Sequence, residues 1–241
     1  MIGSFRKQPL LAGVPAAGTL GALLLLAAAM LPATTAQAAQ VSLQMHRDVR
    51  HYAVSGRNEL AMLRSMRRNG PRVDGKPALA STRMQTRYTA RLRQRNNRCR
   101  VQRLDIDTRF TMTLPRLRNA SAVSARTRKR WPAFLQRLKQ HEERHISIWR
   151  SCLRQVRRTL PTLSAPSCQQ LKRKLRSTYR RIMDDCGKRH DAFDRRERHA
   201  AANLPFIRAA FRAAHGRMAD ARKARKQRQP RKTTTRHHNW R

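Results

Sequence analysis

The middle of the chain alternates between apolar and polar residues, which is the pattern of a β-strand with one buried face. Residues 81–92 place mostly arginine and glutamine at every second position, and a similar alternation follows the polar connection at 93–98. We expect two strands paired as an antiparallel hairpin, with Pro115 ending the second. The second stretch changes phase near its start, so a β-bulge is expected near Gln102 or Arg103.

Shorter elements are expected before this hairpin. His51–Val54 has the composition of a short strand, and Asn58–Asn69 has that of a helix. The Gly70-Pro71 pair that follows is a helix-ending signal, because glycine accepts unusual backbone angles and proline cannot continue a helix. The sequence therefore predicts a strand and a helix upstream of the hairpin.

After the hairpin the apolar residues recur at steps of three and four, the period of an amphipathic helix. One long helix is expected over 124–160, followed by a loop over 161–166 that is bracketed by two prolines. A second helix is expected over 171–193, and Gly187 is a candidate position for a bend in it. A third apolar patch at 204–211 predicts a short docking helix.

The first forty residues have the pattern of an export signal. Arg6 and Lys7 are the only charged residues before residue 46, and Leu20–Leu31 is an apolar run too short to span a bilayer,. Small residues at Ala36 and Ala38 predict cleavage before Ala39, which would leave a mature chain of 203 residues (241 minus 38),. The alternative is an uncleaved membrane anchor.

The chain is strongly basic, and its basic residues are spread along the whole mature part. Lys and Arg number 55 against 13 Asp and Glu, for a formal charge of +42, which attracts polyanions,. In an exported protein these are lipid head groups, lipopolysaccharide, cell-wall polymers or extracellular nucleic acid. An aromatic content of 5% and the lack of a recognised nucleic-acid motif argue against a dedicated nucleic-acid binder,. Residues 217–241 are basic and poor in apolar residues, so we expect a disordered tail.

Four cysteines, an even number in an exported chain, predict two disulfides, and four cysteines allow three pairings. No two of them are closer than sixteen residues, which argues against a cysteine-based structural metal site,. Free buried thiols are the alternative. The cysteines are Cys99, Cys152, Cys168 and Cys186.

The candidate chemistry lies in the long helix, where His141, Glu142 and His145 form an HExxH motif. Residues four apart lie on one face of a helix, about 6 Å from each other, so the two imidazoles can bind one zinc ion. Glu142 would lie beside the metal, within reach of a water that it could deprotonate. The alternative is a pair of surface or capping histidines, but both fall on the apolar stripe between Leu138 and Ile148.

A catalytic zinc needs a third protein ligand. If the two long helices formed a straight hairpin turning near Leu163, His145 would face Ile182. In that geometry His199 would reach the metal only if the second helix bends or ends first. The downstream candidates are His190, Asp191, Asp194, Glu197 and His199.

Further features surround the motif in a fixed order. They are Asn69-Gly70-Pro71, Tyr88, Cys99, the sequence TMTLP at 111–115, Trp131 with Phe134, Pro166-Ser167-Cys168, Phe193-Asp194 and His199-Ala200. With these features the chain from about His51 to Ala200 resembles the domain-of-unknown-function 922 family of predicted secreted zinc-dependent proteases. The resemblance implies that His199 is the third zinc ligand and that Asp194 is a partner of a ligand imidazole.

The resemblance also implies a disulfide between Cys99 and Cys168, which leaves Cys152 and Cys186 to each other. A straight helical hairpin would place Cys152 nearer to Leu175 than to Cys186. The second disulfide therefore requires a bend or an offset between the two helices.

These observations predict an α+β domain over 39–216, in which a small antiparallel sheet packs against the long HExxH helix and a second helix returns beside it. A signal peptide at 1–38 precedes it and the basic tail follows. We expect an exported protein, periplasmic or secreted, that hydrolyses peptide or protein substrates with Zn²⁺ and with Glu142 as general base. The alternative is a non-catalytic basic adaptor that binds polyanions and keeps a structural or vestigial zinc site. Glu142 separates the two, because a structural site needs its histidines and not that carboxylate.

Overall fold

The computed structural model describes residues 38–228, so the expected export signal lies outside the described residues apart from Ala38. The elements are β1 (Gln40–Val54), α1 (Glu59–Asn69), β2 (Arg72–Val73), β3 (Lys76–Pro77), β4 (Ser81–Arg95), β5 (Arg98–Leu117), α2 (Ala125–Thr159), a 3₁₀ turn (Leu160–Thr162), β6 (Ser164–Ala165), α3 (Cys168–Ala202) and α4 (Pro205–Arg228). The α+β class is confirmed. In the part of the chain that the structure describes, no helix is long and apolar enough to cross a membrane.

The main sheet has the order β1-β5-β4, with β6 paired to the start of β5. The expected hairpin of β4 and β5 is confirmed as antiparallel, but β1 runs parallel to β5. We predicted a small antiparallel sheet, and this prediction was wrong for β1. The strand expected at His51–Val54 is only the end of β1, which is fifteen residues long.

The inward side of β1 is only partly covered. Met45 and Val49 lie on the side of β1 that faces the helices, yet their side chains remain 40% and 45% exposed. Arg47 shares that side and forms an ion pair with Glu143 of α2. Val41, Leu43, Met45 and Val49 alternate with polar residues, and only Arg47 breaks this pattern. The sequence therefore carries a strand signal over 41–49 that the prediction of His51–Val54 left out,.

The details of the hairpin follow from particular residues. Asn96 and Asn97 form its two-residue turn, and both have positive φ angles, which asparagine tolerates better than most residues,. Arg91 pairs with Arg103 and Leu92 with Val101, so Gln102 is the extra residue of the expected bulge. β5 continues past Pro115 to Leu117, contrary to our prediction. β4 begins opposite Thr113, so Pro115 of β5 has no partner on β4. The N–H group that proline lacks therefore costs no hydrogen bond to β4.

The expected helices form with recognisable caps. Asn58 accepts a hydrogen bond from the backbone N–H of Ala61 at the start of α1, and Ser124 accepts one from Thr127 at the start of α2,. At the end of α1, a Cβ atom on Gly70 would lie 2.5 Å from the carbonyl oxygen of Met66. Only glycine fits this close approach, which confirms its role in ending α1.

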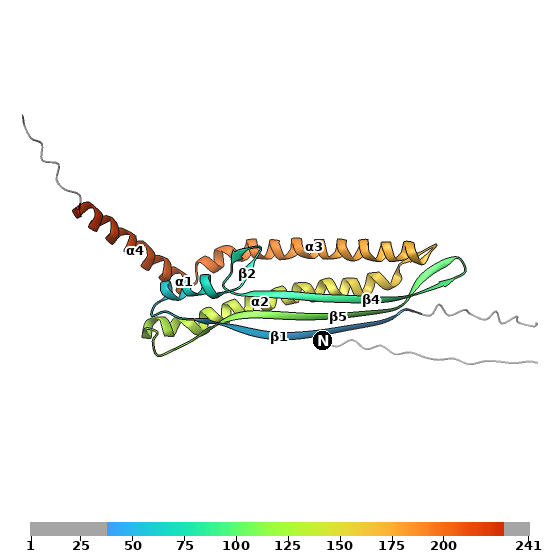
Figure 1. Cartoon of the computed structure of the whole chain (residues 1–241), viewed down its shortest axis with the longest axis horizontal. Helices are drawn as coiled ribbons and strands as arrows, with labels where there is room; N and C mark the ends of the chain where they lie inside the picture. The colour runs from blue at the N-terminus through green and yellow to red at the C-terminus, as the bar shows by residue number, and fades with distance from the viewer. Residues whose placement is uncertain (1–37, 229–241) are drawn as a thin grey trace, which may run out of the picture. The chain divides into compact units, whose positions relative to one another are not determined.

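The long helices α2 and α3 lie along the strands and contact one face of the main sheet (Figure 1). Phe110 of β5 packs against Trp149 of α2, and Tyr88 of β4 packs against Tyr179 of α3. A second apolar cluster joins α1, α2 and α4, where Phe134 and Phe206 stack with ring centroids 4.3 Å apart. The outward positions of the strands are polar.

Both disulfides expected from the resemblance are present, Cys99–Cys168 and Cys152–Cys186. α3 is continuous through Gly187, and a Cβ atom there would meet nothing within 4 Å. The second disulfide therefore forms through an offset between the helices. Residues 160–167 include the 3₁₀ turn and β6, so α3 starts its return later than a hairpin turning at Leu163 would.

The basic end of the chain also differs from expectation. We predicted a short helix at 204–211 and disorder over 217–241, but α4 extends to Arg228. Residues 217–228 are thus helical. Residues 229–241 lie outside the described part.

Candidate metal centre

Two imidazoles of α2 face the same point beside α3. His141 and His145 are one helical turn apart, and their Nε2 atoms lie 3.1 Å from each other. Their side chains are 28% and 13% exposed, so solvent reaches the pair from one side. The predicted juxtaposition of the two HExxH histidines is therefore present.

Asp194 of α3 completes the group. Its Oδ1 atom lies 3.3 Å from Nε2 of His141 and 3.1 Å from Nε2 of His145. Bond lengths of about 2.0–2.1 Å in tetrahedral zinc sites put neighbouring ligand atoms about 3.3–3.4 Å apart. Two nitrogens and one carboxylate oxygen at this spacing form a donor set that fits one zinc ion.

The expected third ligand, His199, is not part of this group. It is exposed in the last turn of α3, five residues beyond Asp194 and therefore on a different side of the helix,. Asp194, expected as a partner of a ligand imidazole, instead directly faces both histidines. Asp191 is exposed, and Glu197 forms an ion pair with Arg137 of α2.

The offset between the helices explains why Asp194, and not His199, lies beside the two histidines. His145 was expected opposite Ile182 in a straight hairpin, but it contacts His190 and Asp194, 8 and 12 residues further along (190 minus 182 and 194 minus 182). This is a shift of roughly two to three helical turns. The histidines therefore face Asp194, which comes earlier in α3 than His199, the ligand that the resemblance implied.

His190 is the second neighbour of His145. Their Nδ1 atoms are 2.7 Å apart, so one ring donates a hydrogen bond to the other. If His145 donates from Nδ1, its Nε2 lone pair faces Asp194 and His141, which is the orientation that a metal ligand needs. Trp149 lies against His190 with ring centroids 4.2 Å apart, and Phe193 lies 5.1 Å from the ring of His145.

The surroundings favour neutral imidazoles. Burial is the main cause that lowers the pKa of His141 and of His145, although Asp194 opposes it. Burial, followed by the neighbouring His145, lowers the pKa of His190 to about 4. Neutral rings have a lone pair to offer, so all three histidines are in the protonation state that metal binding requires at neutral pH.

Glu142, the neighbour of His141 on α2, reaches towards β4. Its side chain is buried, and the hydroxyl of Thr82 on β4 donates a hydrogen bond of 2.9 Å to Oε2. Burial raises the pKa of Glu142 to about 7, although the Thr82 bond opposes the rise. A carboxylate with this pKa can both accept and release a proton at neutral pH.

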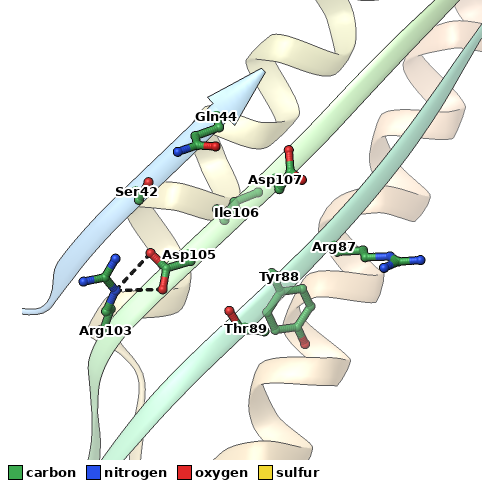
Figure 2. Close-up of a pocket in the computed structure, with 9 residues that line it drawn as sticks. All are labelled: Ser42, Gln44, Arg87, Tyr88, Thr89, Arg103, Asp105, Ile106 and Asp107. Atoms are coloured by element: carbon green, nitrogen blue, oxygen red, sulfur yellow. Dashed lines mark hydrogen bonds and ion pairs between the residues drawn. The ribbon is translucent and has the colours of Figure 1, made fainter. Parts of the chain in front are cut away.

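A separate pocket of about 320 Å³ lies over the sheet strands (Figure 2). Residues from β1, β4 and β5 line it, and Arg103 holds Asp105 through two hydrogen bonds of 3.0 and 2.7 Å. None of the HExxH residues lines it. Its polar side chains belong to the outward strand positions, opposite the face that α2 and α3 cover.

The sequence analysis did not predict that three further residues lie next to the candidate site. Thr82 lies on a strand about sixty residues before the motif, and no local pattern links it to Glu142. Phe193 was noted as an apolar position and as part of the family pattern, and His190 as an alternative ligand. His190 is four residues before Asp194, and this spacing of about one helical turn is the signal that could have grouped these two,.

No curated protein and no solved structure matches the chain. A family model, described as bacterial protein of unknown function (DUF922), matches residues 49–200. This span holds every residue of the candidate centre and covers more than half of the chain. The resemblance expected from the motifs is confirmed, and the chain belongs to the DUF922 family of bacterial proteins.

Proposed function

We propose that this protein is an exported zinc-dependent hydrolase that cleaves peptides. The observation that carries the proposal is the donor triangle of His141, His145 and Asp194, next to the buried carboxylate of Glu142. Two histidines and a carboxylate, with room for one further ligand, form a common protein donor set for catalytic zinc. The 50% exposure of Asp194 supports solvent access to that further position.

A zinc ion held by these residues would polarise a carbonyl oxygen and lower the pKa of water to about 7. Glu142 takes the proton of the attacking water and returns it to the leaving amine nitrogen. Its pKa of about 7 suits both steps. Thr82 holds the carboxylate, and His190 orients the ring of His145.

The burial of Glu142 supports a hydrolase over a non-catalytic adaptor. An ionisable side chain with a single hydroxyl partner among the described residues is costly to bury,. A structural metal site gains nothing from this cost, because Glu142 is not one of the three donors. A general base beside the metal is the use that accounts for it.

Export is part of the proposal. Both disulfides are compatible with an oxidising compartment, where such bonds persist,. Together with the apolar run and the small residues before Ala39, they favour the periplasm or the cell exterior,.

The test compares Glu142→Gln with Glu143→Gln. Both changes remove one carboxylate from adjacent positions of α2, but Glu143 points to Arg47 and lies outside the donor group. We expect one zinc per chain in the parent and both variants by native mass spectrometry. Cleavage of a quenched peptide library should fall about 10²- to 10⁴-fold in Glu142→Gln and stay near the parent in Glu143→Gln.

Cleavage by Glu142→Gln at the rate of the parent would refute the catalytic assignment. A parent that binds zinc and heparin but cleaves no peptide would favour the adaptor.

A further inference from the structure

The helix α4 has two halves with different environments. In the first half Phe206 and Ile207 are buried in the apolar cluster shared with α1 and α2, and Ala210 is buried as well. From Phe211 to Gln227 every residue is exposed except Ala214, which is half-buried. We call residues 211–227 the distal segment. Helices of this length without packing are marginal in water, so this segment needs a partner to be stable.

The distal segment has an apolar stripe. Phe211, Ala214, Met218 and Ala221 follow each other at steps of three, four and three, so they share one face,. Phe211 and Met218 are 53% and 57% exposed, the highest values among the exposed large apolar side chains of the described residues. An exposed stripe of this kind marks an interaction surface.

Cations flank the stripe. The distal segment contains six basic residues, Arg212, Arg217, Arg222, Lys223, Arg225 and Lys226. Its single acidic residue, Asp220, is nine positions from Phe211 and therefore lies about 180° around the helix from it,. The face with the stripe thus combines apolar and positive groups, and the negative group points away.

We propose that the distal segment docks on a lipid bilayer that carries anionic phospholipid head groups. A bilayer takes the apolar stripe into its interface and the cations into its head-group layer. A second copy of a chain with a formal charge of +42 would be repelled,. A nucleic acid would pair with the cations but leave Phe211 and Met218 without a contact.

The first test measures binding of the full mature chain to phosphatidylcholine vesicles with and without phosphatidylglycerol. Phe211→Ala/Met218→Ala keeps every charge and favours the helix. We expect it to weaken binding to the anionic vesicles about tenfold and to leave elution from heparin unchanged. Met45→Ala/Val49→Ala is the matched control, since it removes exposed apolar surface from β1 instead, and should bind vesicles like the parent.

Anionic-vesicle binding that is unchanged in Phe211→Ala/Met218→Ala would overturn the proposal. So would an equal loss on heparin and on vesicles, which would indicate a general polyanion surface. Neither readout uses zinc or catalysis, so the result is independent of the proposed hydrolase.

A second test locates the inserted face. Tryptophan is introduced on the stripe by Phe211→Trp or on another side by Ala213→Trp, about 200° away. Vesicles with brominated phosphatidylglycerol should quench the added fluorescence, measured as the difference from the parent, in Phe211→Trp and not in Ala213→Trp. Equal quenching in both variants, or none in either, would exclude docking through this stripe.

Discussion

Replacing Asp194 with asparagine tests the donor triangle most directly. The change keeps the size and shape of the side chain but removes the negative charge that lies 3.1–3.3 Å from both histidine nitrogens. We expect Asp194→Asn to weaken zinc binding strongly. The fold should survive, since the side chain of Asp194 is half exposed and outside the apolar core.

The size of the effect follows from the contribution of one ligand to the free energy of zinc binding. Zinc sites in small proteins bind with about 10–16 kcal/mol over four ligands, or about 2.5–4 kcal/mol per ligand. At 1.4 kcal/mol per tenfold, loss of one ligand weakens binding roughly 10²- to 10³-fold. A neutral amide oxygen remains a weak ligand, so we expect the lower end of this range.

Competition with a chromogenic chelator at pH 7 measures the zinc affinity. Asp191→Asn is the matched control, because it removes the same charge from an exposed position of α3 that is not in the donor group. His199→Ala tests the ligand that the family resemblance implied, and both controls should bind zinc like the parent. Full zinc affinity in Asp194→Asn together with loss in His199→Ala would refute the donor triangle.

Three further predictions concern the groups around the site. His190→Ala should weaken zinc binding about 10- to 100-fold in the same competition assay, and His190→Asn, which keeps an acceptor, should recover part of it,. In metal-free protein the raised pKa of Glu142 means that the folded state holds its proton more tightly, so stability should fall by about 3 kcal/mol between pH 4.5 and 7,. Urea unfolding at several pH values should show this slope in the parent and not in Glu142→Gln. Loss of Cys152–Cys186, which closes a 34-residue separation, should lower the free energy of unfolding by about 4 kcal/mol, and recovery of four alkylated thiols without reduction would contradict both disulfides,.

The local elements of this fold could be predicted because each has a local cause. The hairpin follows from strict alternation, its bulge from one change of phase at Gln102, and the end of α1 from Gly70. The long helices follow from their apolar stripes. In each case the residues that decide the structure are near neighbours in the sequence.

The third donor could not be predicted in the same way, because it depends on the register between two helices. That register is set by β6, which pairs with β5, and by Cys168, which joins the start of α3 to Cys99. These contacts link residues more than sixty positions apart, and no periodicity within α2 or α3 encodes them. The parallel pairing of β1 with β5 escaped prediction for the same reason.

The candidate centre is built into the packing of the two helices that hold it. Ile146 and Ile148, one and three residues after His145, are both buried. Core contacts therefore fix this part of α2 against the sheet. Two turns further along, Cys152 is joined to Cys186, which is one turn before His190 on α3. The disulfide and the core thus restrain the same two helical segments that supply the donors. Since a small displacement of either helix would separate Asp194 from the histidines, the rigidity of this region is what allows three side chains from distant parts of the sequence to meet at one point.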